Sequence, residues 1–176
     1  MITTKLKIRI YGDPCLRKKS APVKSVGPGE RMLIKAMIET MRDHKGIGLA
    51  APQVGINEQI FVADPGDGDG PIAVINPKIV KKSGSGSLEE GCLSIPGVVL
   101  TIKRPSKITV RFRDENGKEV EKEFTELRAR VLQHETDHLN GKLIIDYAGI
   151  LARKKIRKQL KELEELTKKF KMKNFK

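Results

Sequence analysis

The residues of this chain most suited to chemistry lie in one short stretch, Gln133-His134-Glu135-Thr136-Asp137-His138. Side chains four residues apart lie on the same face of an α-helix, so the imidazoles of His134 and His138 can share one divalent metal ion. Glu135 does not bind the metal in such a motif, and its carboxylate can handle the proton of a water molecule. The alternative is two ordinary histidines on an amphipathic helix. The chain has only three His and two of them fall in this pattern, which favours the metal site.

This motif works only on a helix, and the flanking sequence predicts one. Thr125 and Glu126 are typical of an N-cap and a first helical turn, and Asn140-Gly141 is a stop signal. We expect the helix to span about residues 126–139. Its apolar residues recur at helical spacing, so the metal ligands should lie on a helix that packs into the core.

A catalytic site of this kind needs a third protein ligand. In the metzincin pattern this ligand is a His, but Ile144 stands at its position, and Lys158 stands where a thermolysin-like enzyme has a Glu. The two cysteines remain as candidates. Cys15 lies in a turn near the N-terminus, whereas Cys92 lies in a short apolar segment flanked by Gly and Pro. We therefore expect Cys92 to be the third ligand.

Three segments together resemble the signature motifs of peptide deformylase, in that family's order and at its spacings: GIGLAAPQ at 46–53, EGCLS at 90–94 and QHETDH at 133–138. The likeness extends from about residue 8 to residue 146. The resemblance implies an enzyme that removes the N-formyl group from the initiator methionine of newly made proteins and releases formate. It also implies one divalent metal ion, with Fe(II) as the usual native metal, although a Cys/His₂ ligand set suits Zn(II), Ni(II) or Co(II) as well.

The resemblance also implies roles for residues beyond the metal ligands. Glu135 would carry the proton from the attacking water to the leaving amine. The side-chain amide of Gln53 and the backbone N–H of Leu93 would stabilise the negative charge on the carbonyl oxygen. The backbone of Ile47 and Gly48 would pair with the substrate peptide.

By the same resemblance, the pocket for the methionine side chain is formed by apolar residues from separate segments: Ile47, Leu88, Leu127 and Val131. Glu90 and Gly91 would lie near the peptide backbone. Arg130 departs from family members that carry an apolar residue at its position. It lies one turn before His134, so its aliphatic stem can form a pocket wall while its guanidinium meets a carboxylate.

Polar residues next to the ligands are candidates for orienting them. Gln133 and Asp137 flank the histidines, and either can orient a His ring or the Cys92 segment, with Arg104 as a partner. Solvated surface positions are the alternative for both.

The composition indicates one domain with a single core. The chain has 176 residues, of which 38% are hydrophobic and 32% are charged, and it has no Trp. No apolar run approaches the ~18 residues of a membrane span, and residues 1–7 lack the apolar region of a secretory signal. Two Cys, one of them an expected metal ligand, fit a reducing compartment. We expect a cytoplasmic protein with neither a membrane nor DNA as a partner.

Periodicity and turn signals predict an α+β fold. We expect mostly antiparallel strands around the central metal-binding helix, an N-terminal helix at 29–43 and a C-terminal helix. The expected strands lie at 60–63, 72–75, 98–102, 108–112 and 120–124, with a hairpin turn at Asn116-Gly117. The remaining connections should be a short strand and then a loop at 8–22, a surface hairpin loop at 65–71 and a flexible connection at 81–87.

The last stretch of the chain differs in charge from the rest. We expect a single catalytic domain at 1–150 and a basic amphipathic helix or tail at 151–176. This tail has eleven Lys or Arg against three Glu and so carries +8 of the chain's +13. Its apolar residues recur at helical spacing: Ile156, Leu160, Leu163, Leu166 and Phe170. Two interpretations remain open, a helix docked on the domain with a solvated cationic face, or a helix that attaches the enzyme to the ribosome. A membrane surface is a third possibility, but the apolar stripe has no Trp and is needed for packing.

Two other functions fit part of the pattern. A small H-E-x-x-H metalloprotease shares the metal chemistry, but the third-ligand signatures of the metzincin and thermolysin-like types are missing. A ribosome- or RNA-binding module fits the net charge of +13, but such a module needs no catalytic motif. The expected substrates are therefore N-formyl-methionyl nascent peptides.

Overall fold

The computed structural model describes residues 5–173, and side-chain environments through Phe170. The helices (η for 3₁₀) and strands follow in this order: η1 Pro14–Arg17, α1 Pro28–Asp43, β1 Gly48–Ala50, η2 Ala51–Val54, β2 Ile60–Ala63, β3 Ile72–Ser83, β4 Gly86–Gly91, β5 Val99–Arg104, β6 Lys107–Arg113, β7 Glu119–Thr125, α2 Glu126–Leu139, η3 Ile144–Tyr147 and α3 Ile150–Lys173.

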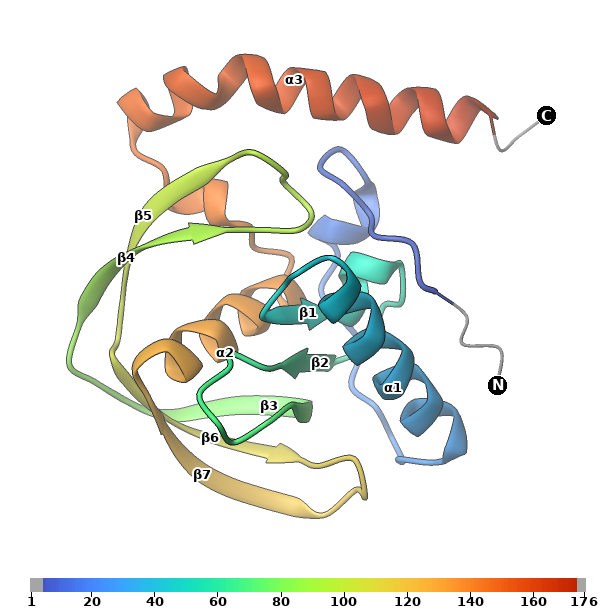
Figure 1. Ribbon diagram of the computed structural model, residues 1–176, viewed down its shortest axis with the longest axis vertical. Helices are drawn as coiled ribbons and strands as arrows, with labels where there is room; N and C mark the ends of the chain where they lie inside the picture. The colour runs from blue at the N-terminus through green and yellow to red at the C-terminus, as the bar shows by residue number, and fades with distance from the viewer. Residues whose placement is uncertain (1–4, 174–176) are drawn as a thin grey trace.

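The strands form two sheets around one helix. The larger sheet has the order β1-β2-β3-β6-β7, and β4 pairs with β5 in a second sheet. All of these strand pairs are antiparallel. Figure 1 shows α2 at the centre with the strands curving round it, α1 beside β1 and β2, and α3 running across one end. This arrangement confirms the predicted α+β fold.

The central helix has the predicted bounds, 126–139. Its apolar side packs against the larger sheet in a cluster that includes Ala129, Leu132, Phe61 and Phe124. The apolar side of α2 is therefore held by the core. Its other side presents His134 and His138 toward β4. The position of the metal motif is set by this packing.

The start of α2 differs in detail from the prediction. Thr125 occupies the N-cap position, but its side chain makes no capping hydrogen bond. The chain passes directly from β7 into α2, and Glu126 adopts a φ of 51° at the junction. The N–H of Glu126 donates to the carbonyl of Ser106 at 2.9 Å instead. The expected cap was right in position and wrong in its hydrogen bond.

The predicted flexible connection at 81–87 was wrong. β3 continues to Ser83 beside β6, and β4 begins at Gly86. Only 84 and 85 separate the strands, and Gly84 has the positive φ of 63° that such a tight break favours. This Lys- and Ser-rich segment can be a strand because its side chains face solvent. Backbone pairing with β6 needs no apolar side chains on that face.

The predicted strand within 8–22 was also wrong. These residues form a turn, the 3₁₀ helix η1 and irregular segments, and they join no sheet apart from an isolated bridge between Ala21 and Glu58. Their backbone groups form hydrogen bonds with segments distant in the sequence. The Arg9 N–H donates to the carbonyl of Gln53 at 2.7 Å. The Tyr11 N–H donates to the carbonyl of Ser94 at 2.8 Å. The N-terminal segment therefore supports two segments of the site.

The C-terminal helix docks on the domain through the first part of the predicted stripe, since Ile156, Leu160 and Leu163 pack in one cluster and Leu166 and Phe170 do not. Ile156 and Leu163 are buried in a cluster with residues of η1, β5 and η3. Leu166 and Phe170 are 46% and 52% exposed, whereas Thr167 is buried and donates to the carbonyl of Tyr11 at 2.8 Å. The stripe therefore continues from Leu163 to Thr167. Among the described residues, no helix is long and apolar enough to cross a membrane.

Candidate metal centre and active site

Three side chains of the predicted ligand set converge between β4 and α2. The ligand atoms of Cys92, His134 and His138 all lie within 4.8 Å of one another, and they are the group in the described part of the chain that could hold a metal ion. The sulfur of Cys92 lies 3.3 Å from Nε2 of His138. One thiolate and two imidazoles suit a divalent transition metal with one coordination position left open.

The protonation states of the two histidines differ. Burial, together with the nearby His134, lowers the pKa of His138 well below its usual value, which keeps its imidazole neutral. Burial also opposes the charge on His134, but hydrogen bonds with Cys92 and Glu90 raise its pKa well above the usual value. A cation at this position competes with the proton of His134, because a metal ligand must be deprotonated.

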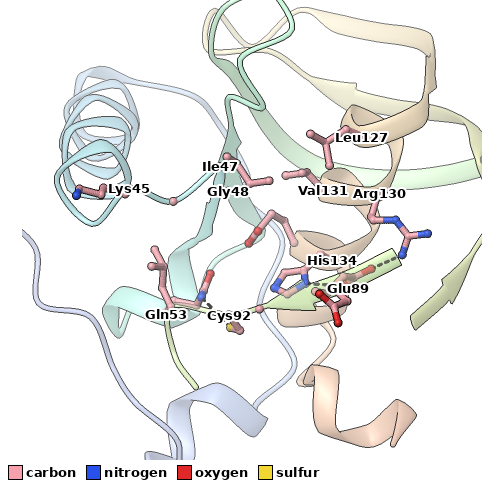
Figure 2. A pocket seen from close by; sticks show the side chains of 15 residues that line it. Lys45, Ile47, Gly48, Gln53, Glu89, Cys92, Leu127, Arg130, Val131 and His134 are labelled. Atoms are coloured by element: carbon pink, nitrogen blue, oxygen red, sulfur yellow. Dashed lines mark hydrogen bonds and ion pairs between the residues drawn. The ribbon is translucent and has the colours of Figure 1, made fainter. Parts of the chain in front are cut away.

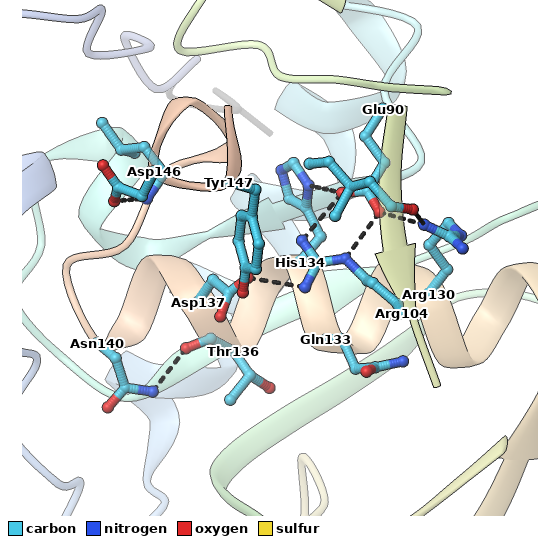
Figure 3. Close-up of polar contacts among 12 residues, drawn as sticks. Glu90, Arg104, Arg130, Gln133, His134, Thr136, Asp137, Asn140, Asp146 and Tyr147 are labelled. Carbon is cyan, nitrogen blue, oxygen red and sulfur yellow. Dashed lines mark hydrogen bonds and ion pairs between the residues drawn. The ribbon is translucent and has the colours of Figure 1, made fainter. Parts of the chain in front are cut away.

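Glu90 is the residue that orients His134. Its Oε2 lies 3.0 Å from Nδ1 of His134, which leaves Nε2 for a metal. Arg104 holds the same carboxylate through two hydrogen bonds of 2.7 and 3.0 Å, and Arg130 donates to it at 2.6 Å (Figure 3). Burial opposes the charge on Glu90, but its bonds with His134 and Arg104 lower its pKa to about 2. A permanently ionised carboxylate fixes the ring and its tautomer.

The sequence had placed this orienting role on other residues. Gln133 donates to the carbonyls of Pro105 and Ala129, both at 2.9 Å, and supports the backbone. Asp137 accepts from Arg104, the predicted partner, at 2.8 Å. Glu90 was expected beside the peptide backbone, yet its side chain is buried in this network. No signal in β4 marked this role, because Glu90 is buried between exposed neighbours without a regular alternation along the strand.

Glu135 is a buried acid with an unsatisfied oxygen. Its side chain is 3% exposed, and Oε2 has no hydrogen-bond partner among the described residues. Burial raises the pKa of Glu135 to about 7. An unpaired carboxyl group that exchanges a proton near neutrality, beside three potential ligands, fits a site where a cation and a water molecule belong.

The amide of Gln53 is fixed in one orientation. Its Oε1 accepts from the Ala50 N–H at 2.8 Å, so its Nε2 must point the other way. That nitrogen lies 3.2 Å from Oγ of Ser94. It also lies 3.6 Å from the sulfur of Cys92 (Figure 2). The geometry therefore directs an N–H donor toward the ligand cluster. Ser94, which was not predicted, helps to hold it.

A cavity of about 420 Å³ opens beside these groups. The cavity is lined by most of the predicted site residues: Ile47, Gly48, Gln53, Glu90, Gly91, Cys92, Leu93, Leu127, Arg130, Val131, His134 and Glu135. Leu88 is an exception, since it is 52% exposed and lies outside this lining. The next residue of β4, Glu89, lines the cavity. Like Glu89, Lys45 and Gly46 line it and were not among the predicted site residues.

Arg130 lines the cavity, but its guanidinium forms hydrogen bonds with the smaller sheet. Besides Glu90, its guanidinium donates to the carbonyls of Ile102 at 2.8 Å and Gly86 at 2.6 Å. The guanidinium meets a carboxylate, as expected for the replacement of an apolar residue at this position. Arg130 thereby joins α2 to both strands of the smaller sheet.

The edge of β1 presents backbone groups to the cavity. The carbonyl of Ile47 accepts from the Asp64 N–H at 2.9 Å, so it is used within the sheet. Because backbone groups alternate in direction along an antiparallel strand, those of Gly48 point away from β2. Of the two residues expected to pair with a peptide, Gly48 has the free backbone edge, and Ile47 is 44% exposed beside it.

An H-E-x-x-H helix, a converging cysteine and an unpartnered acid at one cavity define a mononuclear metal-dependent hydrolase. The family model for polypeptide deformylase matches residues 5–155. The peptide deformylase of Pseudothermotoga lettingae is 49% identical over 158 residues, which are 89% of this chain and 91% of that protein. The peptide deformylase of Thermotoga neapolitana is 46% identical, with 89% and 95% covered.

Solved structures agree with this assignment. The crystal structure of a peptide deformylase from Legionella pneumophila matches with a TM-score of 0.86 at 41% identity, covering 93% of this chain and 97% of that one. The chain therefore belongs to the peptide deformylase family. It is a metal-dependent hydrolase that removes the N-formyl group from the initiator methionine of newly made polypeptides and releases formate. The metalloprotease and RNA-binding alternatives are not favoured.

Proposed function

We propose that Cys92, His134 and His138 hold the metal ion of this deformylase and that Glu135 carries the proton. The observation that supports this most directly is the convergence of the three ligand atoms within 4.8 Å, beside a carboxyl oxygen that has no hydrogen-bond partner. Cys15 is the competing thiol. Its sulfur donates to the carbonyl of Pro52 at 3.4 Å, and it does not belong to the ligand cluster.

A divalent metal held there supplies Lewis acidity, which makes a water molecule a nucleophile near neutral pH and polarises a carbonyl group. Glu135 removes a proton from that water as its oxygen bonds to the formyl carbon. The same carboxyl group then delivers the proton to the nitrogen of methionine as the C–N bond breaks. The products are formate and a free amino terminus. A pKa of about 7 for Glu135 suits both transfers.

The negative charge that develops on the formyl oxygen needs donors fixed in advance. The Nε2 of Gln53 has its orientation set by the bond from Ala50 to the other end of the amide. The backbone N–H of Leu93 directly follows the ligand Cys92 and is our second donor. Preorganised donors of this kind each contribute about 3 kcal/mol to lowering a barrier.

The formyl-methionyl peptide binds along the edge of β1 in this proposal. The free backbone groups of Gly48 pair with the peptide as an added strand. The methionine side chain enters the cavity next to Leu127, Val131 and the aliphatic stem of Arg130. Ile47 and Gly91 border the peptide, and Glu90 acts through His134.

Fe(II) is the native metal that we propose, on the resemblance to the family, and the cytoplasm is the proposed compartment. The donor set also binds Zn(II), Ni(II) or Co(II), so occupancy depends on supply and handling. Elemental analysis after anaerobic purification identifies the metal. A predominance of zinc together with full turnover would refute the iron assignment.

Glu135→Gln tests the catalytic assignment. This variant should keep its metal and lose most turnover of a formyl-Met peptide, because the carboxylate moves a proton and does not bind the ion. Cys92→Ser should lose metal, whereas Cys15→Ser should retain both metal and activity. A metal-free Glu135→Gln protein, or an essential Cys15, would overturn the assignments. An acetylated peptide of the same sequence is the substrate control.

We also propose that 1–150 form the catalytic unit and that the basic segment 151–176 attaches the enzyme to the ribosome, where its substrate emerges. The support is the charge of +8 on the segment and the exposure of most of its Lys and Arg side chains through Lys169. Phosphates of RNA reward such a surface through counterion release.

A further inference from the structure

Tyr147 lies outside the three sequence motifs, yet it contacts the polar network behind the metal centre. Its hydroxyl donates to Oδ2 of Asp137 at 2.8 Å. Burial, together with this hydrogen bond to Asp137, raises the pKa of Tyr147 to about 12. The hydroxyl is therefore a constant donor across the range in which the enzyme works.

The same tyrosine constrains Arg104 in two ways. Asp137 Oδ2, which accepts from Tyr147, also accepts from Nη1 of Arg104 at 2.8 Å. The guanidinium carbon of Arg104 lies 5.0 Å from the centre of the Tyr147 ring, within range of a cation–π contact. Figure 3 shows the ring of Tyr147 and the Asp137 carboxylate next to the Arg104 guanidinium.

From Arg104 the contacts continue to a metal ligand. Its other two nitrogens hold both oxygens of Glu90, and Glu90 Oε2 contacts Nδ1 of His134. Arg104 and Glu90 have side chains only 5% and 6% exposed. An arginine held at one end by Asp137 and Tyr147 cannot rotate away from Glu90 without breaking a buried charge pair.

Tyr147 is 41% exposed, but the short helix that carries it is anchored to the domain. Tyr147 ends η3, in which Ile144 and Ile145 are buried. The neighbouring Asp146 accepts from the Leu143 N–H at 2.9 Å and pairs with Arg17 at 2.6 Å. η3 is thus tied to the N-terminal part of the chain by the residue next to Tyr147. An anchored Tyr147 can therefore restrict the positions of Asp137 and Arg104, which hold Glu90 against His134.

We propose that Tyr147 is a positioning residue for His134, acting through Asp137, Arg104 and Glu90. The proposal rests on the assignment of His134 as a metal ligand. Tyr147 touches neither the ligand cluster nor the cavity, so it acts on the orientation of the His134 ring and not on the substrate. Without the hydroxyl, Arg104 is the one described side chain that still bonds the Asp137 carboxylate. The Arg104–Glu90 pair then gains freedom at its Asp137 end, which is the end farthest from the His134 ring.

The test is the rate at which the full-length, metal-loaded protein releases its ion to a chelator. Direct partners of metal-ligating histidines change metal affinity ~10–100-fold, so for the more distant Tyr147→Phe we expect release that is about 3- to 10-fold faster. In the Co(II) form, the visible absorption bands should broaden or shift, because the ring of His134 is less fixed. Tyr147→Phe keeps the aromatic ring, so the comparison isolates the hydroxyl.

Tyr11→Phe is the matched control, since Tyr11 is the other tyrosine of the chain and lies against α3. It should release metal at the wild-type rate. Asp137→Asn should accelerate release as Tyr147→Phe does, and the double variant should be no faster than the more affected single one, because both act in one pathway. Thermal unfolding of the metal-free proteins measures any general loss of stability.

Wild-type release from Tyr147→Phe would overturn the proposal. So would acceleration that is additive with Asp137→Asn, or acceleration matched by an equal loss of stability in the metal-free protein. His134→Ala separates this outcome from failure of the ligand assignment. If His134→Ala holds the metal as tightly as wild type, the ligand assignment itself is wrong. If Tyr147→Phe releases metal at the wild-type rate while His134→Ala loses it, the ligand assignment stands and the positioning role is wrong.

Discussion

The α-carbon of Gly48 lies directly against the carboxylate of Glu135. A Cβ placed on Gly48 would run into Oε1 of Glu135 and would lie 2.9 Å from Cγ1 of Val131. The edge strand and the acid of the H-E-x-x-H helix are therefore fitted to each other through the absence of a side chain. This glycine lets the proposed substrate edge lie beside the proposed proton carrier.

Gly48→Ala should lower kcat while leaving metal content unchanged. The added methyl group displaces the Glu135 carboxylate, and a misplacement of about 1 Å at a reacting group can reduce rate ~10²-fold. Steady-state kinetics on a formyl-Met peptide, paired with metal analysis, measures both. Gly29→Ala is the matched control, because a Cβ there meets nothing within 4 Å. Wild-type kcat in Gly48→Ala would show that Glu135 moves without consequence.

Gln53→Leu should lower kcat by about 10²–10³-fold with little change in KM, since its hydrogen bond strengthens only as the oxyanion forms. The substitution also leaves the Ala50 N–H without its partner, so thermal unfolding must accompany the kinetics. Gln59→Leu is the control, because Gln59 donates to the carbonyl of Ser20 outside the cavity. A rise in KM alone would assign Gln53 to ground-state binding.

Local signals predicted the catalytic helix, because His134 and His138, the apolar spacing and the Asn140-Gly141 stop all lie within one segment. The proposed third ligand, Cys92, followed from elimination among few candidates. The role of Glu90 depends on the pairing of β4 with β5 and on two arginines from other elements. A residue whose partners are all distant in the sequence carries no local mark of its function.

The C-terminal helix shows the same limit in its packing. The predicted stripe packs at Ile156 and Leu163, but beyond Leu163 the helix turns Thr167 inward to meet the carbonyl of Tyr11. Phe170 is left half-exposed beneath the ammonium of Lys7. The shape of the docking surface decides which side of α3 is buried. Gly12 lies against Glu164, with only 3.0 Å between the position of a Cβ and the helix backbone. Periodicity finds the helix but does not reveal the surface it meets.

The loop between β2 and β3 should stabilise the protein in a pH-dependent way. Arg128 on α2 holds both oxygens of Asp67 and the carbonyl of Gly70. The hydrogen bonds from Arg128 lower the pKa of Asp67 from 3.8 to about 2. A lowered carboxyl pKa contributes stability that is fully present above pH 3.8 and is lost as the pH falls toward 2.

Asp67→Asn should therefore unfold at lower urea than wild type at pH 7, with the difference shrinking between pH 4 and pH 2. Urea titrations of the metal-free proteins at several pH values measure this. Asp69→Asn is the control in the same loop. It removes a carboxylate that forms an exposed ion pair of 3.8 Å with Lys122, whereas Arg128 donates to Asp67. A difference that stays constant down to pH 2 would show that the Arg128 contact does not depend on the charge of Asp67.

Ribosome binding by α3 is best tested by removing charge and not by truncation. A chain cut after Ala152 loses Ile156 and Leu163 from the buried cluster, so its behaviour would mix docking with stability. Lys154, Lys155 and Lys158 are exposed on the helix and can be changed to Gln together. This variant should deformylate a short peptide at the wild-type rate, because none of the three lines the catalytic cavity.

The same variant should bind ribosomes less tightly and with a weaker dependence on salt. Each phosphate contact that is lost lowers the slope of log affinity against log salt by about 0.7–0.9. Co-sedimentation with ribosomes at several salt concentrations measures this slope. Lys78, Lys81 and Lys82, exposed on β3, changed to Gln give a control with the same net charge. Equal binding by both variants would mean that net charge, and not α3, governs association, and wild-type binding by the α3 variant would leave α3 with a structural role alone.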